Sequence, residues 1–141
     1  MRVALPGFTV QAPEIADDGL AARVAAESKA SHVIETAYLE PDEGKGEATP
    51  ASCRDLYQSR PMPAALRGTK GKTADRPGMA VMSSLVETYD GKPLMQENVH
   101  AYLAHAHACA DVHVSKAQYS DADWPLFEKV LATLRVEDDA P

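Results

Sequence analysis

Alternating apolar and polar residues predict a β-hairpin in the stretch from Leu94 to Lys116, which reads LMQENVHAYLAHAHACADVHVSK. With a turn at Ala106-His107, one face carries only apolar pairs: Leu103 with Ala110, Ala101 with Val112, and Val99 with Val114. The opposite face pairs Ala104 with Cys109, Tyr102 with Asp111, and His100 with His113. One register that separates the two faces is what a half-buried antiparallel pair requires.

Three further strands and two helices follow from the same kind of pattern. Segments 8–11, 32–39 and 79–89 are rich in β-branched and aromatic residues, which favours strands, and Asp90-Gly91 after the last of them is typical of a hairpin turn. Apolar and small residues at helical spacing predict a helix from Asp17 or Asp18 to about Lys29. A second helix begins near Trp124, with its buried stripe at Phe127, Val130, Leu131 and Leu134.

Between these elements, residues 40–78 form a segment that we expect to be mostly loop. It contains five prolines and five glycines. A short helix over residues 50–59 interrupts it, because Thr49 is a good N-cap and Pro50 suits the first helical position. Cys53, Leu56 and Tyr57 share one face of this helix.

The resulting order is β-α-β, a loop with a short helix, three antiparallel strands and a final helix. This order indicates an α+β fold in which helices pack on an antiparallel sheet of about five strands. The length of 141 residues fits a single domain over residues 1–141.

Three stretches resemble the Mog1/PsbP/DcrB-like group of small proteins. They are Gly7-Phe8-Thr9-Val10-Gln11-Ala12-Pro13, Asp111-Val112-His113-Val114-Ser115-Lys116, and the helix 126–134 ending in Thr133-Leu134-Arg135-Val136. The resemblance implies a binding or accessory role more often than catalysis, since members bind partner proteins, assist photosystem assembly or sit in the bacterial envelope. The long basic loop and the histidine cluster have no counterpart in that group.

Composition narrows the classes of function. The net charge of −7 disfavours nucleic-acid binding, which depends on neutralising phosphates. No apolar run approaches the roughly 20 residues that span a bilayer, so we expect no membrane insertion. The N-terminal MRVALPGFTV is interrupted by Pro6-Gly7, and strand-like residues begin at Phe8. This pattern fits an exported, periplasmic protein whose signal has been removed, and it also fits a cytoplasmic protein.

Three groups of residues are candidates for chemistry. His100, His113 and Asp111 lie on one face of the predicted hairpin and have the donor types that bind Zn²⁺. The same three residues also fit a polar face without metal. A basic set in the loop, which would hold an anion or an acidic partner or simply face water, consists of Arg60, Arg67, Lys70, Lys72 and Arg76. Cys53 and Cys109 are the only cysteines and are predicted to form a disulfide.

The sequence therefore favours a non-enzymatic binding or accessory protein of the bacterial envelope, without a cofactor, that acts through contact with a protein partner. One alternative is an immunity-type protein that neutralises a toxin. The other is a metal-binding protein or metal-dependent hydrolase that uses His100, His113 and Asp111. The identity of the partner and the oligomeric state stay open.

Overall fold

The computed structural model describes residues 2–3, 7–42 and 46–136, and of residues 2, 3, 70, 72 and 73 it describes the backbone alone. Its strands are β1 (Arg2–Val3), β2 (Thr9–Val10), β3 (Glu14–Ile15), β4 (Ala22–Ser28), β5 (Val33–Pro41), β6 (Thr69–Thr73), β7 (Ala80–Tyr89), β8 (Lys92–His105), β9 (Ala108–Lys116) and β10 (Leu134–Arg135). Its helices are α1 (Pro50–Gln58), α2 (Trp124–Leu131) and two 3₁₀ turns, η1 (Ala64–Leu66) and η2 (Asp121–Asp123).

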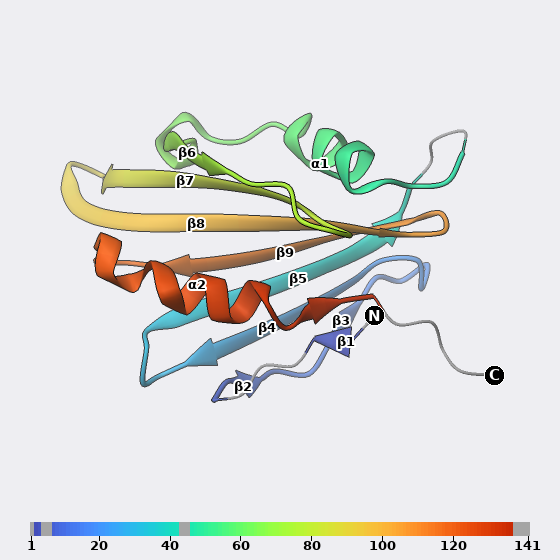
Figure 1. Cartoon of the computed structure of the whole chain (residues 1–141), viewed down its shortest axis with the longest axis horizontal. Coiled ribbons are helices and arrows are strands. Elements are labelled where there is room, and N and C mark those ends of the chain that lie inside the picture. The colour runs from blue at the N-terminus through green and yellow to red at the C-terminus, as the bar shows by residue number, and fades with distance from the viewer. Residues whose placement is uncertain (1, 4–6, 43–45, 137–141) are drawn as a thin grey trace.

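One antiparallel sheet dominates the fold, with strand order β2-β4-β5-β9-β8-β7-β6 and β3 also paired with β4 (Figure 1). A separate two-stranded ribbon joins β1 to β10. The predicted α+β class with an antiparallel sheet is confirmed, but the sheet has more strands than the five expected. None of the helices in the described ranges is long and apolar enough to cross a membrane.

The predicted hairpin is confirmed as β8 and β9, in the register derived from the sequence. Val99 pairs with Val114, His100 with His113, and Tyr102 with Asp111. The turn at Ala106-His107 gives Ala106 a positive φ of 51°. The Asp90-Gly91 turn between β7 and β8 is also confirmed, with positive φ at both residues. β9 lies in the middle of the sheet, so this hairpin connects its two halves.

The predicted helix from Asp17 or Asp18 to Lys29 is wrong. Residues 22–28 form strand β4, which pairs with β5 from Ala22–Leu39 to Ser28–Val33. Asp18 instead caps a turn, since its carboxylate accepts a hydrogen bond from the backbone N–H of Leu20. Alanine is a strong helix former, but helix propensity is a small energy per residue, and pairing with a long neighbouring strand overrides it.

The expectation of loop in residues 40–78 is only partly right. The short helix is confirmed as α1, but residues 69–73 form the edge strand β6 beside β7. Gly71 permits this approach, because a Cβ at that position would lie 2.5 Å from Ser83 Oγ. β6 therefore pairs with β7 in a stretch where Gly68 and Gly71 had favoured loop.

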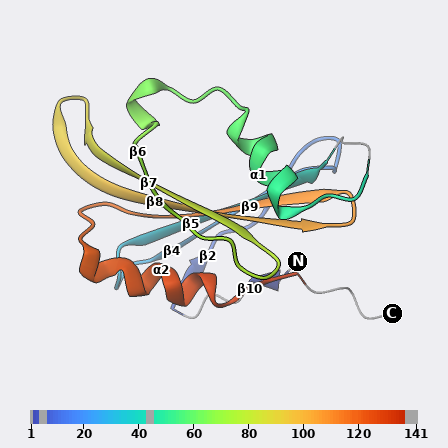
Figure 2. The ribbon, with the colours of Figure 1, turned by 45° about the horizontal axis from the view of Figure 1, so that its top comes forward.

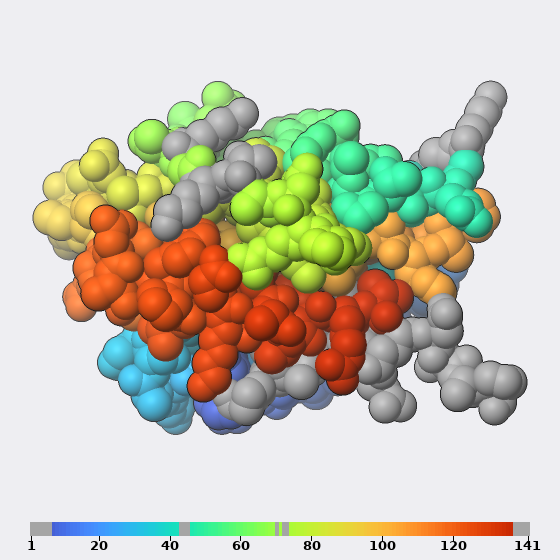
Figure 3. Space-filling model, viewed as in Figure 1, coloured from blue at the N-terminus to red at the C-terminus, as the bar shows by residue number. Residues whose placement is uncertain are grey.

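The two helices cover opposite faces of the sheet, as Figure 2 shows. α2 lies across the middle of one face, seen in orange-red in Figure 3. Phe127, Val130 and Leu131 of α2 pack there with Val99, Val112 and Val114, which confirms the predicted buried stripe. Leu134 belongs to this core as well, although it lies in β10 and not in the helix. Phe127 is 1% exposed, and truncating a buried phenylalanine typically costs about 3–5 kcal/mol.

Glu35 is a buried carboxyl group on the α2 face. Glu35 of β5 pairs with Val114 of β9 and Ala26 of β4, and it is 2% exposed. Its Oε2 atom has no hydrogen-bond partner among the described residues. Burial raises the pKa of Glu35 to about 7, because the charged form loses its hydration.

The stability of the protein should therefore carry a pH dependence that originates at Glu35. A folded-state pKa above the unfolded value of 4.5 favours the native state below that value, and the advantage is lost as the pH rises toward 7. We expect the free energy of unfolding of Glu35→Gln, relative to that of the wild type, to increase by up to about 3 kcal/mol as the pH rises from 4.5 to 7. Urea unfolding at several pH values measures the difference.

Glu27→Gln is the matched control, because Glu27 is an exposed glutamate on the neighbouring strand β4. If the difference in unfolding free energy between Glu35→Gln and the wild type were the same at every pH between 4.5 and 8, Glu35 would not be the origin of the pH dependence.

Candidate functional site

The helix α1 is built by local signals that the sequence shows clearly. The Thr49 side chain accepts a hydrogen bond from the backbone N–H of Ser52, and the Ser52 hydroxyl accepts one from the backbone N–H of Thr49. Pro50 occupies the first turn, where its missing N–H has no cost. The resulting helix turns Cys53 toward the sheet, where its exposed fraction is 0%.

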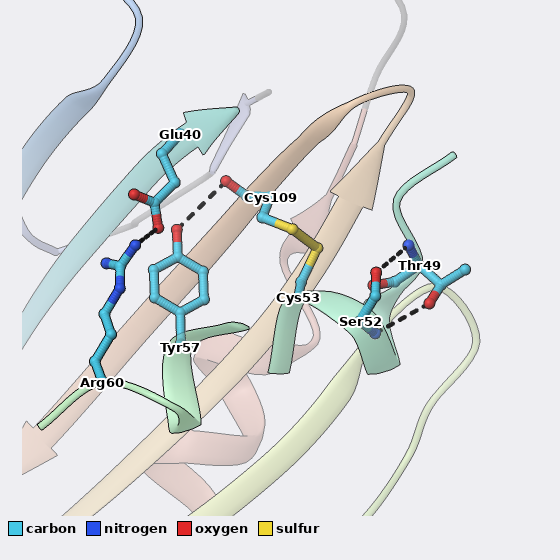
Figure 4. The surroundings of a disulfide bond; sticks show 7 residues. All are labelled: Glu40, Thr49, Ser52, Cys53, Tyr57, Arg60 and Cys109. Atoms are coloured by element: carbon cyan, nitrogen blue, oxygen red, sulfur yellow. Dashed lines mark hydrogen bonds and ion pairs between the residues drawn. A yellow bond between two sulfur atoms is a disulfide. The ribbon is translucent and has the colours of Figure 1, made fainter. Parts of the chain in front are cut away.

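A disulfide fastens α1 to the sheet face opposite α2 (Figure 4). Cys53 is bonded to Cys109 of β9, the pair predicted from the sequence, with their Cα atoms 5.3 Å apart. Tyr57 donates a long hydrogen bond of 3.4 Å to the Cys109 carbonyl, and Gln58 donates one of 2.7 Å to the Tyr102 hydroxyl. Cys53, Ala80, Tyr102 and Cys109 form a small second core, with Leu56 and Tyr57 packed against it.

Beside this second core lies the predicted trio His100, Asp111 and His113, in which His100 is hydrogen-bonded to Asp111 and His113 is hydrogen-bonded to Asn98. His100 Nδ1 lies 2.9 Å and 3.1 Å from the two carboxylate oxygens of Asp111. His113 Nε2 lies 3.0 Å from the amide oxygen of Asn98. An ionised carboxylate and an amide oxygen only accept, so His100 carries its proton on Nδ1 and His113 on Nε2.

Burial sets the protonation of His113. Loss of hydration, followed by the neighbouring His100, lowers the pKa of His113 to about 4, although Asp111 acts in the opposite direction. Because this pKa lies below the unfolded value of 6.5, the neutral His113 stabilises the fold above that pH, and the contribution is lost as the pH falls toward 4.

The two imidazole rings are stacked, with centroids 4.3 Å apart and an interplanar angle of 3°. The lone pairs of an imidazole lie in the ring plane, so those of two parallel rings do not meet at one point. Within the described residues, no group of three or more His, Cys, Asp or Glu side chains is arranged to hold a metal ion. The zinc site at His100, Asp111 and His113 stays a prediction, and binding there would require a ring to turn.

A pocket of about 490 Å³ opens next to His100. α1 and the segment after it form one wall, and β7 and β8 form the floor. The lining residues are Tyr57, Gln58, Ser59, Arg60, Pro61, Met62, Arg67, Gly68, Met82, Ser83, Ser84 and His100. This volume lies in the range of roughly 300–1,000 Å³ that is typical of ligand sites.

The five basic candidates do not act as one group. Arg60 and Arg67 line the pocket, whereas Arg76 donates a hydrogen bond of 2.6 Å to Glu128 of α2, on the other face. Lys70 and Lys72 belong to β6, and their side chains lie outside the described part of the structure.

Several pocket residues were missed by the sequence analysis. Arg60 forms an ion pair with Glu40 of β5, and its guanidinium lies 4.8 Å from the centre of the Tyr57 ring (Figure 4). Met82, Ser83 and Ser84 read as ordinary strand residues of β7, and Gln58 as the end of a short helix. Arg60, Arg67 and His100 were candidates from the sequence, but nothing in the sequence indicated that they line one pocket.

No family model, curated protein or solved structure matches the chain. The resemblance to the Mog1/PsbP/DcrB-like group accordingly stays a prediction.

The disulfide can be checked by alkylation and intact-mass measurement. We expect freshly purified protein to take up no alkylating label until reductant is added, and two labels afterwards, because the bond consumes both thiols. All samples are labelled in denaturant, because both cysteines are buried in the folded protein, and Cys109 of Cys53→Ala should then be labelled without reductant. Two labels on unreduced wild-type protein would refute the bond.

Zinc binding can be tested by metal analysis after dialysis. We expect no zinc above background, because His100 and His113 each already face an oxygen acceptor and their rings are parallel. One equivalent of zinc in the wild type, lost in the His100→Ala/His113→Ala variant, would instead establish the metal-binding alternative.

Proposed function

We propose that this chain is a non-enzymatic binding protein of the bacterial envelope and that it holds a protein partner on the face covered by α1. The observation that carries the proposal is the pocket between α1 and strands β7 and β8, whose helical wall is attached covalently to the sheet. A wall fixed in this way lowers the ordering cost of binding.

The surroundings of the pocket have the composition of a protein interface. Arg60 and Arg67 line it together with Tyr57 and Met62, and Met62 is 44% exposed. Arginine, tyrosine and methionine are enriched at the cores of interfaces, whereas lysine and glutamate are depleted. On the uncovered part of the same sheet face, Ile34 and Tyr38 of β5 are also exposed.

The disulfide supports the envelope as the compartment. Structural disulfides form and persist in oxidising environments such as the periplasm, and are rare in the reducing cytoplasm. The immunity-type alternative uses the same surface with a toxin as partner, and the net charge of −7 would favour a basic one.

Photo-crosslinking in the source organism tests the proposal. A photoreactive phenylalanine analogue at Met62 should give a discrete crosslinked product, because that side chain lines the pocket. The same analogue at Tyr89 is the control, since Tyr89 is exposed at the far end of β7. No discrete product from Met62, or equal products from both positions, would contradict the proposed binding face.

A further inference from the structure

The pocket presents hydrogen-bond donors that are already oriented. Arg67 donates from Nε to the carbonyl of Met62, at 3.3 Å, which holds the side chain and leaves its two Nη groups for another acceptor. Arg60 is held by Glu40 through Nη2 and by the Tyr57 ring, so the Nη1 and Nε groups of its guanidinium stay available as donors. Paired donors of this kind match a carboxylate.

The pocket is also lined by hydrogen-bond acceptors, and His100 Nε2 is one of them. Asp111 lies on β9, on one side of β8, and it fixes the proton of His100 on Nδ1. Nε2 is the ring nitrogen that Asp111 leaves unoccupied, and His100 lines the pocket together with Met82 to Ser84 of β7. No described residue is hydrogen-bonded to Nε2, so in the neutral form of the ring its lone pair can accept from a ligand N–H.

We propose that this pocket binds the C-terminal residue of a partner peptide. Such a residue carries a carboxylate for Arg67 and Arg60, and the adjacent backbone amide supplies an N–H for His100. The last side chain would lie against the apolar lining, which includes Pro61, Met62 and Met82. Methionine side chains adapt to different shapes, so the pocket suits a range of apolar terminal residues.

This inference rests on the proposed function, because it names the part of the partner that the α1 face recognises. A peptide terminus fits the pocket because the carboxylate carbon and the N–H nitrogen of the last residue are both bonded to the same Cα atom. Chloride or sulfate satisfies the arginines but has no hydrogen to donate to His100 Nε2.

Three synthetic ligands test the proposal by NMR titration of the oxidised, ¹⁵N-labelled protein. The first is acetyl-glycyl-glycyl-leucine with a free carboxylate, the second is its C-terminal amide, and the third replaces the last amide N–H by an ester oxygen. We expect the free acid to shift the amide signals of Gly68, Ser83 and Ser84. Removing the carboxylate should weaken binding about tenfold or more, and removing the N–H about threefold to tenfold.

Protein variants complete the test. Arg67→Gln should weaken binding of the free acid about tenfold and should fold normally, because Arg67 is exposed. Arg54→Gln is the matched control: Arg54 lies on α1 but does not line the pocket, and its variant should bind as the wild type does.

Equal shifts with all three ligands, or no shifts at the pocket at millimolar concentration, would overturn the assignment of a peptide terminus. That failure is distinguishable from failure of the proposed function, because crosslinking at Met62 detects a partner whatever group the pocket recognises. If Met62 crosslinks to a partner but none of the peptides shifts the NMR signals, the proposed function would stand and only the assignment of a peptide terminus would be wrong.

Discussion

The register of the β8–β9 hairpin is the constraint on which the rest of the structure depends. Side chains alternate between the faces of a strand, so a shift by one residue would exchange the two sets completely. In the observed register, Val99, Val112 and Val114 face α2, whereas Tyr102 and Cys109 face α1. The core thus lies on one face of the β8–β9 pair, and the candidate site lies on the other.

The two helices are held by different forces. α2 buries Phe127, Val130 and Leu131 against the sheet, and this apolar contact is its main attachment. α1 has nine residues and only Cys53 is buried, which is too little apolar contact to hold a helix that short. The Cys53–Cys109 bond supplies the missing constraint, and closing a loop of this length contributes roughly 2–4 kcal/mol. The wall of the pocket consequently depends on the redox state of one bond.

Local patterns predicted the elements whose own residues decide their structure. The hairpin follows from strict alternation, and α1 from Thr49 and Pro50. β4 was missed because its alanines are good helix formers, and only pairing with β5 makes the segment a strand. The pocket could not be predicted, because it brings Arg60 and Arg67 beside Met82 of β7 and His100 of β8, and these segments meet only through the sheet and the packing of α1. The disulfide was predictable because Cys53 faces inward from α1 and Cys109 falls on the matching hairpin face.

Hydrogen exchange of the backbone amides in oxidised and reduced protein tests the central claim most directly. If the disulfide holds α1 over the sheet, reduction should greatly accelerate exchange in residues 53–58 while β8 and β9 stay protected through the α2 core. Exchange in α1 that does not change on reduction would show that other contacts hold the helix. Exchange that increases equally throughout the chain would show that the disulfide supports the whole fold and not this site.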